Sequence, residues 1–271
     1  MAKFCWTLQI KKNSIELSQS LRQPSINTIM KTLCLDFGNT RLKAAIFEND
    51  SFLEETVLPD EGFLPAIEKL LEIHQPTRSI LSSVIDNDPT VESLLASKTK
   101  FHKLSHLTKA NFTIPVGKPE TVGADRLALC AAAVHFYPGK NNLVIGMGTC
   151  ITYNFINQYH EFLGGSISPG MEMRFKAMHE FTAKLPLVHP EWNYPLIGYD
   201  TKTNLQSGVM AGISFEMAGF IDSYAAKYEN FNVVLTGGDT PYFAGQLKKK
   251  IFADYNFLFK GLYALSETNN E

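Results

Sequence analysis

Short apolar runs and polar clusters alternate along the chain in a pattern that predicts an α/β fold. Near the start, Thr32–Leu35 and Lys43–Phe47 are apolar runs separated by a polar, glycine-containing segment, and Glu48–Ser51 is a turn cluster. Short apolar runs bounded by turn residues are typical of strands. This part therefore predicts a strand, a tight turn, a second strand, a turn and a third strand. Beyond it, the pattern predicts a helix over 61–73, a strand over 79–84 and a short helix over 91–95.

The second half of the chain has the same mixture of patterns. The segment from Asp125 to Phe136 is rich in Ala and Leu at helical spacing and ends before Pro138-Gly139, which predicts a helix. Apolar runs predict strands over 143–145, 151–156 and 231–235, and helical spacing covers 170–181 and 204–228.

Two segments are similar enough to predict an internal duplication. Residues 34–53 align without gaps with residues 144–163, and each copy has the pattern of strand, glycine turn, strand, turn and strand. As a duplication, this predicts two similar α/β domains that face each other across a cleft. The predicted domains are residues 30–138 and residues 139–271. The boundary lies earlier if the helix from Asp125 belongs to the second half, and a match this short can also arise by chance.

Composition and charge narrow the classes of function. An apolar fraction of 45% supports a substantial core. The net charge of -2 argues against nucleic acid and anionic membranes as partners. No apolar run approaches the ~18 residues of a membrane-spanning helix. The four cysteines form no CxxC pair and match no zinc template, so we expect reduced thiols in a cytoplasmic protein.

Residues 1–29 differ in character from the rest. They lack the apolar run of a secretory signal and match a transit peptide only weakly. We interpret residues 1–29 as a disordered or non-native extension, followed by a domain that begins at Met30.

Two glycine turns at matching positions of the repeat are candidate phosphate-binding sites. Asp36-Phe37-Gly38-Asn39-Thr40 follows a predicted strand, and Gly148-Thr149 occupies the mirrored position. Glycine lets backbone N–H groups approach an anion closely. Thr40 can donate a hydroxyl, and Asp36 can hold Mg²⁺ directly or through water. Taken alone, the first motif fits an ordinary hairpin turn equally well.

Three further segments carry weaker signals. Thr236–Asp239 places a glycine pair after a strand, which suits a bound nucleotide but also a simple strand-to-helix turn. The composition of Gly164–Gly170 predicts a glycine-rich loop that leads into a helix. The simpler interpretation of this loop is a connector between two elements without a binding role. In Gly123–Arg126, Asp125 could act as a base while Arg126 orients an anionic substrate. The alternative for this segment is helix capping with a surface ion pair.

The duplicated unit and the glycine turns together resemble the actin/hexokinase/Hsp70-like ATPase superfamily, whose ribonuclease H-like domains face each other across a nucleotide cleft. Over about residues 31–265 the chain is similar to the type III pantothenate kinases. The segments that carry this resemblance are LDFGNT, PETVGADRLA, GMGTCITYNF, GGSISPG, FTAKLPLV, QSGVMAG and LTGGD. The resemblance implies a transferase that uses ATP to phosphorylate pantothenate to 4′-phosphopantothenate, the first step of coenzyme A biosynthesis.

The resemblance also implies roles for individual residues. Asp125 would be the general base, and Gly123, Ala124 and Arg126 would bind the substrate. Thr182 would reach the pantothenate pocket of the partner in a homodimer. Asp36 would take part in holding Mg²⁺. The residues implied to bind ATP are Asp36, Phe37, Gly38, Asn39, Thr40, Lys43, Gly148, Thr149, Gly237 and Gly238.

The chain departs from the family pattern in three places. Gly146 stands where the family usually has an Asp that helps to bind a monovalent cation, K⁺ or NH₄⁺, so that cation site is in doubt here. Asn154 also stands where Asp is common. The segment PVGKPET, residues 115–121, is shorter than the family's loop, and no counterpart of its substrate-facing tyrosine is found.

Two alternatives to pantothenate phosphorylation follow from these departures. One is a non-catalytic, nucleotide-binding regulatory relative of the same fold, and the other is a kinase acting on another small hydroxy acid. The presence of both Asp36 and Asp125 favours an enzyme. ATP binding is therefore better supported than the identity of the substrate.

Overall fold

The computed structural model describes residues 30–85, 89–247 and 251–269, so the interpretation of residues 1–29 as an extension lies outside the described residues. The first of its two sheets has the strand order β3-β2-β1-β4-β5. Its strands are β1 (Lys31–Phe37), β2 (Leu42–Glu48), β3 (Ser51–Leu58), β4 (Arg78–Ser83) and β5 (Lys100–Lys103). β1, β2 and β3 are antiparallel, whereas β4 and β5 run parallel to β1.

The second sheet repeats this topology. Its strands are β6 (Asn141–Met147), β7 (Cys150–Ile156), β8 (Phe162–Pro169), β9 (Phe231–Thr236) and β10 (Phe252–Ala253). Their order is β10-β9-β6-β7-β8, with β6, β7 and β8 antiparallel and β9 and β10 parallel to β6. β1 and β6 lie at the offset that aligned the two sequence segments. The predicted duplication of an α/β unit is therefore confirmed.

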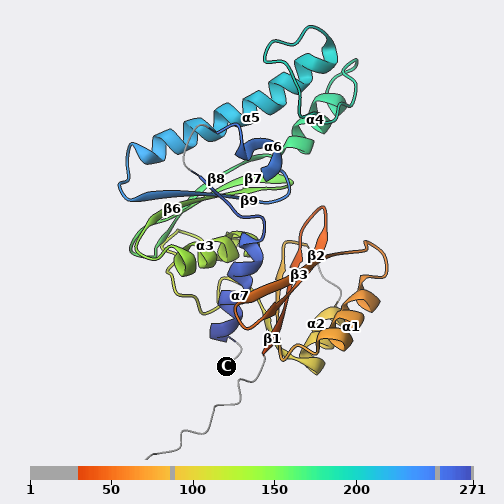
Figure 1. Ribbon diagram of the computed structural model, residues 1–271, viewed down its shortest axis with the longest axis vertical. Helices are drawn as coiled ribbons and strands as arrows, with labels where there is room; N and C mark the ends of the chain where they lie inside the picture. Colours follow the sequence, from red (N-terminus) through yellow and green to blue (C-terminus); the bar gives the residue numbers. More distant parts are fainter. Residues whose placement is uncertain (1–29, 86–88, 248–250, 270–271) are drawn as a thin grey trace, which may run out of the picture.

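The helices form layers on both sides of the two sheets (Figure 1). They are α1 (Phe63–His74), α2 (Pro89–Lys98), α3 (Ala124–Phe136), α4 (Met171–Glu180), α5 (Thr201–Ala225), α6 (Thr240–Ala244) and α7 (Phe257–Asn269), with a 3₁₀ turn at Pro119–Thr121. α3 and α7 lie between the sheets, α1 and α2 cover the outer face of the first sheet, and α5 extends along the outer face of the second.

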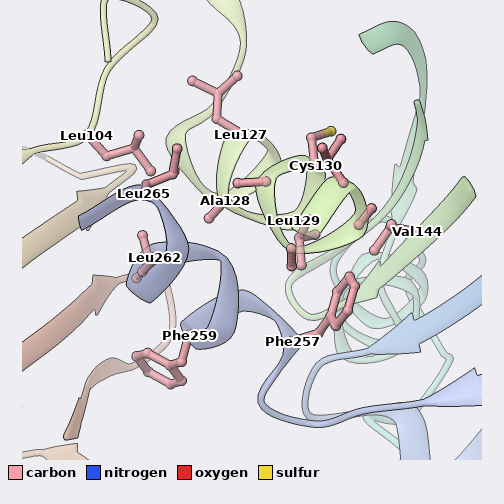
Figure 2. Close-up of a cluster of buried hydrophobic side chains, with 14 of the residues drawn as sticks. Leu104, Leu127, Ala128, Leu129, Cys130, Val144, Phe257, Phe259, Leu262 and Leu265 are labelled. Atoms are coloured by element: carbon pink, nitrogen blue, oxygen red, sulfur yellow. The ribbon is translucent and has the colours of Figure 1, made fainter. Parts of the chain in front are cut away.

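The inner layer depends on small residues. α3 carries a run of buried alanines, and a Cβ on Gly261 of α7 would lie only 1.9 Å from the carbonyl oxygen of Ala128. The backbones of the two helices can meet this closely because neither presents a large side chain at the crossing. Figure 2 shows Leu262, Leu265 and Phe257 of α7 gathered around α3. Together these helices fill the space between the sheets.

Alternate residues of the central strands point into different cores. Cys34 of β1 and Val144 of β6 belong to the inner core around α3 and α7. Leu33 and Leu35 face the core under α1 and α2, whereas Leu143 faces the core under α4 and α5. Strands buried on both faces are apolar at nearly every position. This explains why the sequence showed continuous apolar runs there.

The structure corrects one prediction and adds elements that the pattern missed. Gly164–Pro169, predicted as a loop, lies in strand β8. Gly164 and Gly165 adopt φ values of 99° and 150°, and Gly165 lets the strand approach β7 so closely that a Cβ there would lie 1.7 Å from the carbonyl oxygen of Tyr153. α6, α7 and the short strands β5 and β10 had not been predicted.

The division into residues 30–138 and 139–271 stays a prediction, and α7 packs against β1 and β4 of the first sheet. Within the described ranges, no helix has both the length and the apolarity that crossing a membrane requires.

Candidate active site

The two glycine turns of the repeat meet between the two sheets. The hydroxyl oxygens of Thr40, in the β1–β2 turn, and Thr149, in the β6–β7 turn, lie 2.6 Å apart. Each turn is closed by a backbone hydrogen bond: the N–H of Gly38 donates to the carbonyl of Arg41 at 3.1 Å, and that of Gly148 donates to Cys150 at 3.0 Å. Residues separated by more than a hundred positions thus form one polar surface.

Asp36 lies at the end of β1, opposite Lys43 on β2 and Ser82 on β4. Burial raises the pKa of Asp36 to about 7, and the nearby charges of Asp125 and Glu55 act in the same direction, while Ser82 and Lys43 oppose it. The Lys43 ammonium also contacts Glu55 Oε1 at 2.5 Å. The ionised form of Asp36 is therefore energetically unfavourable in the folded protein unless a cation binds to it.

Asp125 is in the first turn of α3, which begins directly after Gly123. Its Oδ1 lies so close to Gly123 that a Cβ there would be 2.5 Å away. Burial raises the pKa of Asp125, and the backbone N–H and the charge of Arg126 oppose the rise. The structure thus brings Asp36 and Asp125 from two different elements near each other. A paired arrangement of this kind is common where carboxylates carry out chemistry.

Arg126 is held by a neighbour that the sequence did not connect with it. Its Nε donates to Oδ1 of Asn154 at 2.6 Å, and its guanidinium lies 5.4 Å from the centre of the Phe162 ring. The Asn154 amide donates in turn to the carbonyl of Val144 and to Thr152 Oγ1. Asn154 therefore orients Arg126, a role that no local pattern reveals.

The Thr236–Asp239 turn comes against the first strand of the second sheet. Gly237 has a φ of 100°, and a Cβ there would lie 2.2 Å from the carbonyl oxygen of Met147, so only glycine fits. A Cβ on Gly238 would meet no atom within 4 Å. The backbone at Gly238 is thus open to a ligand.

Asp239 was included in this turn from the sequence, but no role had been predicted for it. The pKa of Asp239 is raised to about 6: burial is the largest cause, the charge of Glu172 acts in the same direction, and Arg41 opposes both. Arg41 lies in the turn between β1 and β2, whereas Asp239 and Glu172 belong to the second half of the chain. The only signal in the sequence was that Arg41 directly follows the Asp36–Thr40 segment and that Asp239 is the last residue of the Thr236–Asp239 segment.

Not every predicted site residue joins this group. Thr182 follows α4, and its hydroxyl donates to the carbonyl of Met178 at 2.7 Å. α4 packs on the face of the second sheet opposite α3, so Thr182 does not join Asp36 and Asp125 within one chain. The side chains of Phe37 and Ala124 are buried in the cores, while Asn39 is exposed.

The stability of the protein should depend on the charge of Asp36, and we expect Asp36→Asn to be more stable than the parent protein at pH 8. In the unfolded chain an Asp carboxyl has a pKa of about 3.9, and in the fold the value is about 7. The ionised Asp36 therefore disfavours folding increasingly as pH rises from about 4 to about 7, and by a constant amount above that.

The gain from Asp36→Asn should be on the order of 1–3 kcal/mol at pH 8, and it should shrink as pH falls towards 4. Urea unfolding of both proteins at pH 5 and pH 8 measures it. Equal stabilities at pH 8 would show that the carboxylate is well solvated in the fold.

The arrangement suits phosphoryl transfer assisted by a metal ion that few side chains hold. Among the described residues, no group of three or more His, Cys, Asp or Glu side chains could hold a metal ion. Mg²⁺ in nucleotide sites needs only one or two carboxylates, because phosphates and waters complete its shell. Asp36 fits that requirement. Asp125 fits a general base, and the two glycine turns fit the phosphates of a nucleotide.

Comparisons with known proteins agree with this geometry. A family model described as "Type III pantothenate kinase" matches residues 32–223. A type III pantothenate kinase of Christiangramia forsetii is 44% identical over 238 residues, covering 88% of this chain and 98% of the relative. One from Bacteroides fragilis is 40% identical over 242 residues, with the same coverages.

Solved structures with low identity share the fold. A protein from Campylobacter jejuni described as a Baf family transcriptional activator has a TM-score of 0.57 at 21% identity, covering 88% of this chain and 98% of its own. A protein from Listeria monocytogenes described as an N-acetylmannosamine kinase has a TM-score of 0.52 at 14% identity, covering 88% and 99%. The family model and the close relatives go further than the fold: the chain belongs to the type III pantothenate kinase family.

Proposed function

We propose that the protein transfers a phosphoryl group from ATP to the hydroxyl of pantothenate, giving 4′-phosphopantothenate in the first step of coenzyme A biosynthesis in the cytoplasm. The observation that carries the proposal is the meeting of the Thr40 and Thr149 turns beside the Asp36–Asp125 pair. It agrees with the names of the relatives, which are type III pantothenate kinases.

In this proposal the two glycine turns hold the phosphates of ATP, and Gly237 and Gly238 line the nucleoside. Asp36 holds Mg²⁺, which neutralises the phosphate charge when it is bound. Asp125 takes the proton from the attacking hydroxyl, and Arg126 orients the pantothenate carboxylate. The contact of Arg126 with Asn154 supports this role because it orients the guanidinium in advance.

A coupled assay of ADP release with and without pantothenate tests the proposal. ADP release that depends on pantothenate is the expected result. ADP release only with another hydroxy acid would identify a different substrate, and nucleotide binding without turnover would identify a regulatory relative. The family membership and the retained Asp36 and Asp125 do not favour that last alternative.

We also propose a homodimer in which Thr182 serves the partner's site. Large apolar side chains are exposed around α5 and the loop before it: Phe181, Trp192, Leu196, Ile197, Tyr199 and Phe215 are each at least 64% exposed. A clustered apolar surface of this kind is typical of a contact between proteins. α4, which precedes Thr182, packs beside α5.

Phe215→Glu should therefore produce a monomer with little activity, because a charge at the centre of an apolar contact opposes association. Sedimentation at micromolar concentration, together with the kinase assay, measures both effects. An active monomer of the parent protein would contradict the homodimer.

The response to monovalent cations should be weak. Gly146 has no side chain to offer a cation, and Asn154 offers a neutral amide that already contacts Arg126 and Thr152. Affinity for hard cations grows with the negative charge of the ligands, so K⁺ or NH₄⁺ should bind weakly or act only at high concentration.

Turnover measured against K⁺ at fixed ionic strength, with a bulky organic cation as replacement, tests this expectation. Strong activation that saturates at low millimolar K⁺ would contradict it. Gly146→Asp should gain dependence on K⁺, provided that the fold adapts: a Cβ there would lie 2.9 Å from Thr152 Oγ1 and 3.1 Å from Leu129 Cδ1, both side-chain atoms that can shift.

A further inference from the structure

A cluster of hydrogen-bonded side chains lies behind the Gly148–Thr149 turn and has no part in the reaction proposed above. Nη2 of Arg174 donates to Glu216 Oε2 at 2.5 Å and to Ser168 Oγ at 2.7 Å, and its Nε donates to the carbonyl of Pro169 at 2.9 Å. The Tyr153 hydroxyl donates to Glu216 Oε1 at 2.8 Å. We call Arg174, Glu216, Tyr153 and Ser168 the Arg174 clamp.

The clamp joins four elements and is anchored in the core of the second half. Arg174 comes from α4, Glu216 from α5, Tyr153 from β7 and Ser168 from the end of β8. The Tyr153 ring is fully buried and stacks on Phe220 with the ring centres 4.1 Å apart. Because a buried aromatic ring fixes Glu216, the carboxylate holds the guanidinium in one place.

The residue that follows β8, Gly170, contacts the Gly148–Thr149 turn directly. The N–H of Gly170 donates to the carbonyl of Thr149 at 3.0 Å, and a Cβ on Gly170 would lie 2.1 Å from the carbonyl oxygen of Gly148. The segment that Arg174 holds through Ser168 and Pro169 therefore rests directly on the backbone of the turn. A shift of that segment must move Thr149, whose hydroxyl faces Thr40.

We propose that Arg174 is a positioning residue for nucleotide: through Pro169 and Gly170 it sets the Gly148–Thr149 turn in the place where that turn contacts the ATP phosphates. The inference rests on the proposed function in its use of ATP, but not on pantothenate as the acceptor. Arg174 itself touches no reacting atom.

Arg174→Met tests the proposal, because Met retains much of the aliphatic stem and removes every donor. Displacing a contact by a fraction of an ångström to about 1 Å costs up to roughly 100-fold. We expect Arg174→Met to weaken Mg·ATP binding roughly 10-fold to 100-fold, and to change the KM for pantothenate less than twofold. Calorimetric titration with a non-hydrolysable ATP analogue measures the first effect and needs no acceptor.

Two further variants separate positioning from charge and from stability. Arg174→Lys keeps the charge, but a single ammonium cannot reproduce the fork of donors, so it should restore less than half of the lost binding free energy. Lys260→Met removes an ion pair of similar exposure, between Lys260 and Asp254 at 2.7 Å, neither of which belongs to the Arg174 clamp. It should lower the melting temperature about as much as Arg174→Met while leaving affinity for the analogue unchanged.

The outcomes differ clearly. Affinity of Arg174→Met for the analogue within twofold of the parent protein overturns the proposal, and so does full rescue by Lys. If Arg174→Met does not fold, Glu216→Gln replaces it, since the amide keeps the size of the side chain while weakening its bond to Arg174. A parent protein that binds the analogue but does not phosphorylate pantothenate would refute the proposed substrate. The titration of Arg174→Met with the analogue would still decide this inference, because it needs no acceptor.

Discussion

Asp125→Asn should lower kcat by a factor of roughly 10²–10⁴, the usual effect of losing a general base. Asn has nearly the same size as Asp and can still accept a hydrogen bond from the backbone N–H of Arg126, so the start of α3 should keep its geometry. What disappears is the ability to accept the proton of the attacking hydroxyl. Affinity for ATP should change little, because the glycine turns remain intact.

Steady-state kinetics together with direct nucleotide binding measure both expectations for Asp125. Because burial raises the pKa of Asp125, the parent protein should also lose turnover as pH falls through that raised value, while the residual activity of Asp125→Asn should not follow the same titration. Asp200→Asn is a matched control: Asp200 caps α5, another helix N-terminus, and Asn is an equally good cap. Near-full turnover of Asp125→Asn would identify Asp125 as a helix-capping residue alone.

Asp36→Ala should weaken the productive use of Mg·ATP by roughly 10- to 100-fold, since it removes a hard oxygen ligand, or the group that orients one. The loss should appear in the dependence of turnover on Mg²⁺, with the half-saturating concentration rising. The loss caused by Asp36→Ala should also exceed the loss caused by protonating Asp36 in the parent protein at pH 6. With a pKa of about 7, part of Asp36 is still ionised at that pH.

Titration with Mg²⁺ at constant ATP measures the effect of Asp36→Ala. Asp50→Ala provides a control, because Asp50 is an exposed carboxylate in the turn between β2 and β3 of the same sheet. If Asp36→Ala keeps both its Mg²⁺ dependence and its turnover, the metal must be held elsewhere. If Asp36→Ala is stable but has low activity, the charge of Asp36 destabilises the fold and is nevertheless needed for catalysis.

Most regular elements could be predicted because their signals are local. β1, β6 and β9 each contain an unbroken apolar run, Leu33–Leu35, Leu143–Ile145 and Val233–Leu235, since both faces of these strands are buried. The alanine-rich pattern of α3 also identified that helix to within a residue or two. The repeat predicted the start of β8 near Phe162, but its Gly164–Pro169 part was predicted as a loop because glycines and serines are typical of loops. Gly165 allows a close approach to β7 that only the partner strand explains.

The sequence by itself determined most of the strand and helix pattern, the glycine turns and the two carboxylates, because each depends on residues within a few positions of one another, and comparison of two segments of the sequence determined the repeated unit. Only the tertiary structure decided which of these groups meet. Thr40 faces Thr149, Arg126 bonds to Asn154, Arg41 acts on Asp239, and α7 returns to the first sheet. Such contacts depend on how two sheets pack around α3 and α7. That packing depends on the burial of many apolar side chains that are far apart in the sequence, and the local spacing of apolar residues does not predict which of them meet.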